Sequence, residues 1–171
     1  HYTRSVNVER DADSLAVVRS YIPTSRALRT LDRVQSAFGS HQAPRAWSLV
    51  GPYGSGKSSF SVFLSQLLAT PEEAATRVAA SVLRAADEEL RKRFGSHTRG
   101  SNGYCRILLT GSPEPLGARL VGGLAKAAQE TLGSDRKKAS KQLLEELAVA
   151  AEQNTIQATR LIELVEAFQN A

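Results

Sequence analysis

Apolar residues recur every three or four positions through most of this chain, the spacing of one face of an α-helix. The pattern predicts a helical turn at residues 14–19. It also predicts helices over residues 25–38, 60–68, 71–94 and 113–132, and from 135 to the end, divided near Asn154 and Thr155. In each helix the apolar residues form a single stripe, so each is expected to bury one face and expose the other.

Residues that start or stop helices stand near the ends of these stripes. Thr70, Pro71 and Glu73 have the order of a cap, a first-turn proline and a capping-box acid, which indicates a helix start. Gly39 and Gly133 follow the last apolar residue of two other stripes, where glycine commonly ends a helix.

Two short segments depart from the helical pattern. Residues 45–50 and 104–110 are near-continuous apolar runs bounded by turn-forming residues, which favours buried β-strands. Cys105 lies within the second run and is interpreted as a small core residue.

A glycine-rich motif follows the first predicted strand and matches the phosphate-loop spacing G-x-x-x-x-G-K-[ST]. Its residues are Gly51, Pro52, Tyr53, Gly54, Ser55, Gly56, Lys57 and Ser58, followed by Ser59. The glycines let backbone N–H groups approach phosphates closely. Lys57 is the expected phosphate contact and catalytic residue, and the Ser58 hydroxyl is the expected ligand of Mg²⁺. The motif predicts that the chain binds ATP with Mg²⁺.

A strand, a phosphate loop and a helix in this order predict an α/β fold, a three-layer α/β/α sandwich around a parallel sheet. Two strands are too few for such a sheet, so the fold is expected to be incomplete in this helix-rich chain. No apolar run ends in Asp or Glu, so the Walker B acid needed for hydrolysis is expected to lie beyond Ala171 or not to have been retained in this chain. The predicted division is an N-terminal arm (1–20), a nucleotide-binding core (21–133) and a helical extension (134–171).

Composition narrows the class of protein only slightly. The 171 residues are 42% hydrophobic and 23% charged, as in ordinary globular domains, and no run is long enough to span a membrane. A single cysteine suits a reducing cytoplasm. The net charge of +5 permits a nucleic-acid partner without requiring one. The chain starts at His1 and contains no methionine, so it is expected to be part of a longer polypeptide.

Tyr21 and Ile22 form a short apolar-aromatic segment upstream of the motif. One interpretation is that they contact the adenine ring. The other is that they pack beneath the following helix.

Two clusters of charged residues are candidate functional groups. The acidic run at residues 87–89 lies within a helical pattern and is interpreted as a solvent-facing surface. Arg91, Lys92 and Arg93 are interpreted as complementing a helix C-terminus, with contact to a phosphate backbone as the alternative.

The motif and the segment that continues to Phe60 resemble the phosphate loop of AAA+-like ATPases. With residues 21–24 and 108–112, the chain is similar to the N-terminal region of large bacterial ATP-binding proteins associated with phage defence and DNA restriction. This resemblance implies a hydrolase module that drives conformational change in a multi-subunit, DNA-associated antiviral assembly. It also implies protein partners or a homo-oligomer.

Three hypotheses follow. The first is a motor or switch ATPase of AAA+ type. The second is a small kinase with the same loop, using Arg91, Arg93 or Arg99 as a lid. The third is a nucleotide-sensing or scaffold domain that does not hydrolyse ATP.

Overall fold

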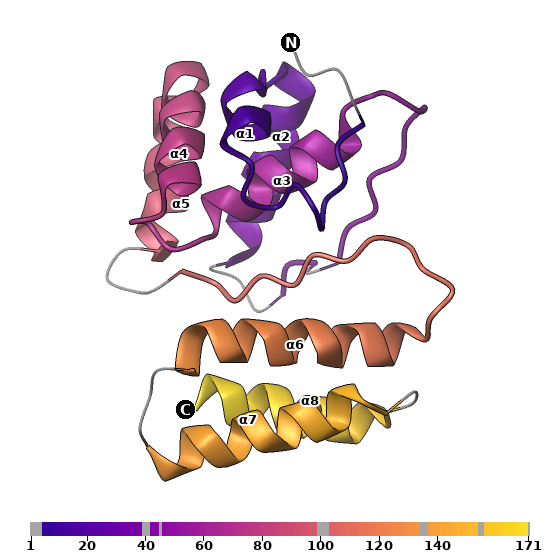
Figure 1. Cartoon of the computed structure of the whole chain (residues 1–171). Helices are drawn as coiled ribbons and strands as arrows, with labels where there is room; N and C mark the ends of the chain where they lie inside the picture. The colour runs from indigo at the N-terminus through magenta and orange to yellow at the C-terminus, as the bar shows by residue number, and fades with distance from the viewer. Residues whose placement is uncertain are drawn as a thin grey trace. The chain divides into compact units, whose positions relative to one another are not determined.

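A computed structural model describes residues 5–38, 42–44, 46–98, 103–133, 137–153 and 156–170. Within these ranges all regular secondary structure is helical, and no β-strand forms (Figure 1). The helices are α1 (Leu15–Ser20), α2 (Ser25–Phe38), α3 (Lys57–Leu67), α4 (Ala74–Ala86), α5 (Glu88–Thr98), α6 (Leu116–Leu132), α7 (Lys138–Ala151) and α8 (Ala158–Gln169). None of these helices is both long and apolar enough to cross a bilayer.

The chain divides into two compact units, His1–Arg106 and Ile107–Ala171. The first unit contains α1 to α5 and the second contains α6 to α8. Each unit has its own cluster of buried apolar side chains.

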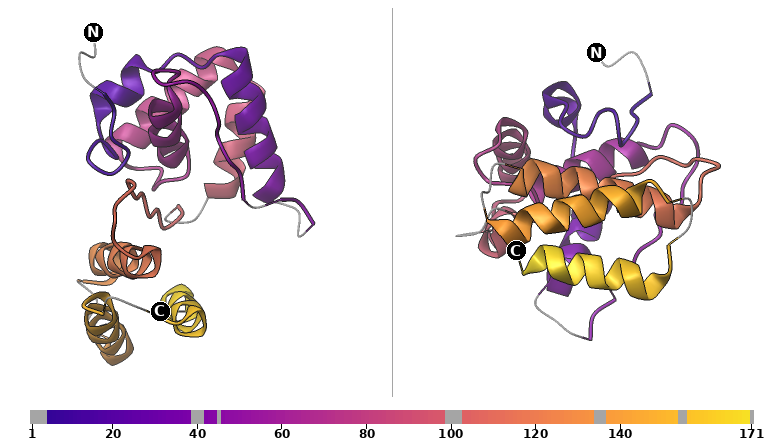
Figure 2. Two further views of the ribbon diagram at one scale, coloured as in Figure 1. Left: turned by 90° about the vertical axis from the view of Figure 1, so that its right-hand side faces the viewer. Right: turned by 60° about the horizontal axis from the view of Figure 1, so that its bottom comes forward.

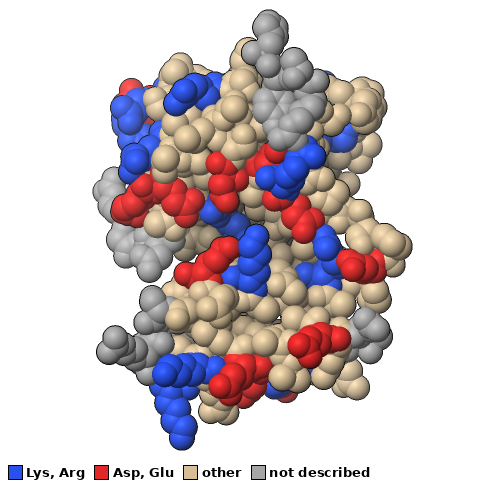
Figure 3. Space-filling view, in the orientation of Figure 1, with Lys and Arg blue, Asp and Glu red and all other residues tan. Residues whose placement is uncertain are grey.

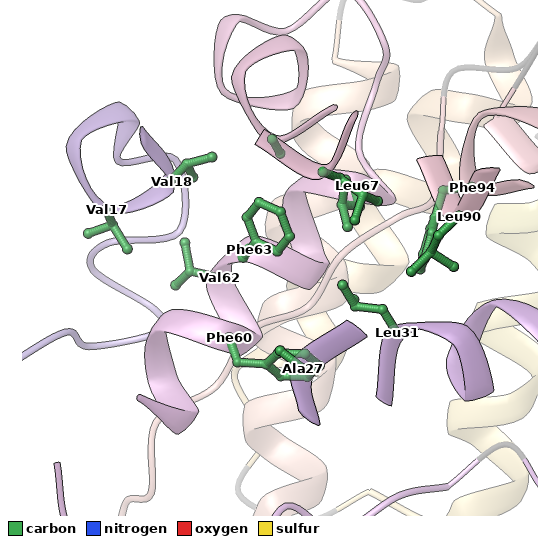
Figure 4. Packing of buried hydrophobic residues seen from close by; sticks show 12 residues of the cluster. Val17, Val18, Ala27, Leu31, Phe60, Val62, Phe63, Leu67, Leu90 and Phe94 are labelled. Carbon is green, nitrogen blue, oxygen red and sulfur yellow. The ribbon is translucent and has the colours of Figure 1, made fainter. Parts of the chain in front are cut away.

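Helix α3 lies at the centre of the first unit. Its side chains Phe60, Val62 and Phe63 are buried, and they pack against apolar residues of the surrounding helices (Figure 4). Those residues are Val17 and Val18 of α1, Ala27 and Leu31 of α2, Ala79 and Leu83 of α4, and Leu90 and Phe94 of α5. The apolar stripes of α1 to α5 therefore meet in one core.

The second unit is a three-helix arrangement in which α6, α7 and α8 each contact the other two (Figure 2). Its buried side chains include Val121 and Leu124 of α6, Leu143 and Leu147 of α7, and Leu164 of α8. Three amphipathic helices can bury their apolar stripes against one another without a sheet.

The helix predicted over residues 71–94 is two helices. Asp87 is extended (φ −159°, ψ 99°), and its Oδ1 accepts a hydrogen bond of 2.9 Å from the backbone N–H of Leu90. Asp is a strong N-cap, so it ends α4 and starts α5. Glu88 and Glu89 then lie exposed in the first turn of α5, where they complement the helix dipole. The prediction of a solvent-facing acidic run is confirmed for these two residues and wrong for Asp87, which is half-buried.

The predicted α/β sandwich is wrong. Residues 46–50 and 103–112 carry no regular secondary structure, and the apolar side chains of Trp47, Leu49 and Val50 are 47%, 43% and 93% exposed. Cys105, predicted to be a core residue, is also exposed. A buried strand needs neighbouring strands to pair its backbone groups. Such neighbours are lacking in the described ranges, and helix-on-helix packing buries the apolar stripes instead.

Gly103 allows the segment after α5 to approach the end of α3. Its φ is +76°, and a Cβ at this position would lie 2.5 Å from the carbonyl carbon of Ala69. The next residue, Tyr104, donates its backbone N–H to the Leu68 carbonyl at 2.8 Å. The backbone conformation and the close approach both require glycine here.

Gly103→Ala is therefore expected to lower the free energy of unfolding by about 2 kcal/mol, combining left-handed strain with a backbone clash. Gly111→Ala is the matched control, because a Cβ there meets open space and its φ is not positive. Urea unfolding followed by circular dichroism compares the two. Equal stabilities for both variants would contradict the close approach at Gly103.

Candidate functional site

Residues 51–58, called the glycine loop from here on, lead into the N-terminus of α3. Gly54 and Gly56 have φ values of +77° and +82°, in the left-handed region that residues with a Cβ rarely adopt. Gly56 is the N-cap of α3, and the Ser55 N–H donates to the Pro52 carbonyl at 3.3 Å. The glycines are therefore required by the turn itself.

The Lys57 side chain folds back into the glycine loop. Its Nζ donates to the carbonyl oxygens of Gly51 and Pro52, both at 2.8 Å, and to Ser55 Oγ at 3.4 Å. An ammonium group has three N–H donors, so these three acceptors satisfy all of them. The loop is thus closed around its own cation.

The start of α3 adds further positive potential beside Lys57. The first turn of a helix leaves backbone N–H groups without intrahelical partners, and the helix dipole places a partial positive charge there. No side chain of Gly56 can cap these groups, and the first turn of α3 carries no acidic residue. The α3 N-terminus and Lys57 together form a site suited to an anion.

The glycine loop forms one wall of an open pocket of about 560 Å³. Nine of the predicted site residues line it: Tyr21, Ile22, Tyr53, Gly54, Ser55, Gly56, Lys57, Ser58 and Ser59. The other two, Gly51 and Pro52, lie outside the lining and contribute the carbonyls that bind Lys57. The structure thus brings the upstream segment and the glycine motif to one place.

The lining contains four further residues that the sequence pattern does not indicate: Ser5, Val6, Val17 and Ser20. Ser5 Oγ lies 3.1 Å from the Tyr53 hydroxyl, which joins the N-terminal segment to the glycine loop. That segment is held on α3 by Gln66, whose Nε2 donates to the Ala12 carbonyl and to Asp13 Oδ1, each at 2.8 Å. No local pattern indicates a contact between residues 48 positions apart.

Tyr21 both packs against α3 and lines the pocket. Its ring stacks on Phe63 with centroids 4.5 Å apart and an interplanar angle of 27°. Burial raises the pKa of the Tyr21 hydroxyl to about 12. Ile22, by contrast, is 80% exposed. The two interpretations of Tyr21 are thus compatible, while Ile22 does not pack beneath the following helix.

The raised pKa of Tyr21 predicts a loss of stability at alkaline pH. The Tyr21 hydroxyl ionises more easily in the unfolded chain than in the folded protein. Its contribution to the free energy of unfolding is therefore complete below pH 10 and is lost as the pH rises from about 10 to about 12. Tyr21→Phe is expected to flatten this part of the stability profile. Urea unfolding from pH 8 to 12 measures it, and identical alkaline slopes for the two proteins would contradict the burial of the hydroxyl.

The basic cluster after α4 is largely engaged within the protein. Arg93 Nη1 lies 2.6 Å from Asp32 Oδ1, and Lys92 Nζ lies 2.7 Å from Glu89 Oε1. The pairing with Glu89 and Glu88 raises the pKa of Lys92. Arg91 lines a separate pocket with Leu67 and Phe94, and Arg99 lies outside the described residues. Neither Arg91 nor Arg93 lines the glycine-loop pocket, so the predicted kinase lid finds no support there.

A resident metal centre is not evident in the described ranges, where no group of three or more His, Cys, Asp or Glu residues could hold an ion. The described lining of the glycine-loop pocket contains no carboxylate. Ser58 lines the pocket and can supply one hydroxyl ligand to Mg²⁺. Because the described lining has no carboxylate, the other ligands of Mg²⁺ would come from phosphate oxygens and water.

Comparison with protein-family models, curated proteins and solved structures finds no match to this chain. The resemblance to AAA+-like ATPases is therefore wrong on two findings: no family model supports it, and the described chain is helical without the parallel sheet of that fold. The assignments to a phosphate-loop hydrolase and to antiviral defence lose their basis with it. A short motif reports local loop geometry, and it does not determine the architecture around it.

Proposed function

We propose that this chain is a nucleotide-binding module that takes Mg·ATP in the glycine-loop pocket and uses it as a sensor or scaffold ligand. The observation that carries the proposal is the Lys57 ammonium group held at 2.8 Å from two loop carbonyls, beside the N-terminus of α3. Cation, loop and helix end converge on one open pocket.

Binding exchanges the partners of Lys57. Carbonyl oxygens carry partial charge, whereas phosphate oxygens carry full charge and form stronger hydrogen bonds with an ammonium group. A phosphate at the N-terminus of α3 would draw the Nζ of Lys57 away from the carbonyls of Gly51 and Pro52. The backbone N–H groups of the first turn of α3 would donate further hydrogen bonds to the phosphate. The loop conformation therefore responds to the ligand.

The same pocket also offers apolar side chains that can contact a base. Tyr21 is fixed by its stacking on Phe63, and Ile22 presents an exposed apolar side chain to the pocket. Small-molecule sites commonly combine such apolar walls with a few well-placed polar groups. This arrangement suits a ligand with a charged chain at one end and an aromatic ring at the other.

Binding without hydrolysis is favoured by the composition of the lining. Its described side chains are apolar groups, hydroxyls and Lys57, and a carboxylate that could orient an attacking water is not among them. A ligand can still shift a conformational equilibrium through its differential affinity for two states. The loop with Lys57 bound to its carbonyls and the loop with Lys57 released from them would be two such states.

Ser58→Ala is expected to weaken the binding of Mg·ATP about tenfold and to leave the binding of metal-free ATP nearly unchanged, since only the metal loses a ligand. Isothermal titration calorimetry with Mg²⁺ and with EDTA measures both affinities. Ser61→Ala is the control, because Ser61 Oγ donates to the Lys57 carbonyl within α3 and does not line the pocket. An equal loss with and without Mg²⁺ would contradict the metal role.

A thermal-shift series tests the function as a whole. A ligand at 100 times its dissociation constant stabilises a protein by about 2.7 kcal/mol, enough to raise the melting temperature by a few degrees. We expect Mg·ATP to give the largest shift, Mg·ADP a smaller one and AMP almost none, because the loop binds phosphates. Equal shifts for AMP and ATP, or no shift with any nucleotide, would overturn the proposal. Phosphate release by this chain alone would overturn the non-hydrolytic role.

A further inference from the structure

Helix α2 presents three arginines along one exposed stripe. Arg26, Arg29 and Arg33 are all exposed, and at 100° per residue they fall within an arc of about 60° on the helix surface. The buried side chains Leu31 and Val34 belong to the face that packs into the core. We call these three arginines the α2 stripe.

The α2 stripe has no acidic partners within the part of the chain that the structure describes. Asp32 is the only acidic residue of α2, and it pairs with Arg93 of α5. Other arginines do have such partners: Arg106 pairs with Glu73, and Arg160 with Glu146. On the face shown in Figure 3, basic and acidic side chains are interspersed over both units. Three arginines without an acidic partner in the described residues therefore lie together on one exposed face of α2.

The two units differ in net charge, and the positive one is the unit that contains α2. Residues 1–106 contain 15 basic and 9 acidic residues, a net charge of +6, whereas residues 107–171 contain 7 and 8, a net charge of −1. The excess positive charge thus belongs to the unit that carries the α2 stripe. Like charges spaced three and four positions apart on a helix also repel one another and destabilise it slightly.

We propose that the α2 stripe binds the phosphate backbone of a nucleic-acid duplex. Arg26 and Arg33 are separated by about 10.5 Å along the helix axis, which corresponds to about three steps of 3.4 Å along a duplex, so the three arginines can contact phosphates of one backbone segment. All three residues are arginines, whose planar guanidinium groups match phosphate in a bidentate manner. The exposed residues of α2 are Ser25, Arg26, Arg29, Arg33 and Ser36, so the stripe carries no apolar side chain for insertion into a membrane.

Fluorescence anisotropy with labelled 20-base-pair DNA and RNA duplexes tests the proposal, independently of the nucleotide site. Three phosphate contacts predict a slope of about −2.7 for the logarithm of affinity against the logarithm of salt concentration. Affinity should therefore fall about 40-fold between 50 and 200 mM salt. The combined variant Arg26→Gln, Arg29→Gln and Arg33→Gln should lose binding and its salt dependence, with an unchanged circular dichroism spectrum.

Two matched variants separate the α2 stripe from net charge. Lys126→Gln, Lys138→Gln and Lys141→Gln together remove the same charge from exposed positions of the second unit and should bind as wild type does. The triple Arg→Lys variant of the α2 stripe keeps the three positive charges and should retain the salt slope. This variant controls for a folding defect caused by replacing all three arginine side chains. Equal losses in the two Gln variants, no duplex binding by wild type, or equally tight binding of polyglutamate would overturn the proposal. Preference for DNA or RNA would identify the source of the backbone.

Discussion

Lys57→Ala is expected to weaken the binding of Mg·ATP about 100-fold, because it removes a charged donor from the phosphates. The same substitution deletes the hydrogen bonds to the Gly51 and Pro52 carbonyls. Those carbonyls lie in an exposed loop, so water can replace the ammonium group and the helical fold should persist. Titration calorimetry measures the affinity, and circular dichroism measures the helix content.

Lys126→Ala is the matched control for this prediction. Lys126 is an exposed cation of α6 in the second unit and does not line the glycine-loop pocket. It should bind Mg·ATP with wild-type affinity, which separates a local role of Lys57 from the loss of one positive charge. Wild-type affinity in Lys57→Ala would exclude the glycine loop as the phosphate site.

Phe63→Ala is expected to lower the free energy of unfolding by about 3–5 kcal/mol. Phe63 is fully buried at the centre of the first unit, and its removal leaves a cavity beneath the Tyr21 ring. The effect should reach the pocket as well, because Tyr21 loses the surface on which it stacks. Urea unfolding measures the stability, and a loss below 1 kcal/mol would contradict the central position of Phe63.

Ile22→Ala separates the pocket from the core. Ile22 lines the pocket but is 80% exposed, so its truncation should leave stability within about 0.5 kcal/mol of wild type. A weaker affinity for ATP with an unchanged affinity for inorganic triphosphate would place the base beside Ile22. A large loss of stability would instead show that Ile22 belongs to the core.

The helical stripes could be predicted from sequence because each is a local property. Residues such as Leu31, Phe60 and Leu124 are buried as their spacing indicates. The predicted strands failed because a short apolar run is equally compatible with an exposed coil, and only non-local pairing would make it a strand. The division of the long helix depended on Asp87, whose capping bond to Leu90 competes with helix continuation.

The glycine loop was predictable for the same reason of locality. Its spacing places left-handed glycines and Lys57 at the start of a helix within eight residues. The partners from distant segments were not predictable, as with Ser5 beside Tyr53. The pairing of charged residues could not be predicted either, because Arg93 and Asp32, which form an ion pair, are 61 positions apart. Such long-range ion pairs distinguish the basic cluster at residues 91–93 from the α2 stripe, which has no acidic partner in the described residues.

The most direct test of the central claim is a backbone amide NMR titration of the wild-type chain with Mg·ATP. We expect saturable shifts of the amides of Gly54, Gly56, Lys57 and Ser58, because phosphates would displace Lys57 from the loop carbonyls and bind the first turn of α3. AMP, which carries a single phosphate, should shift the same amides only at much higher concentration. Saturable shifts confined to other parts of the chain, or none at millimolar Mg·ATP, would contradict the claim that this loop binds the phosphates of a nucleotide.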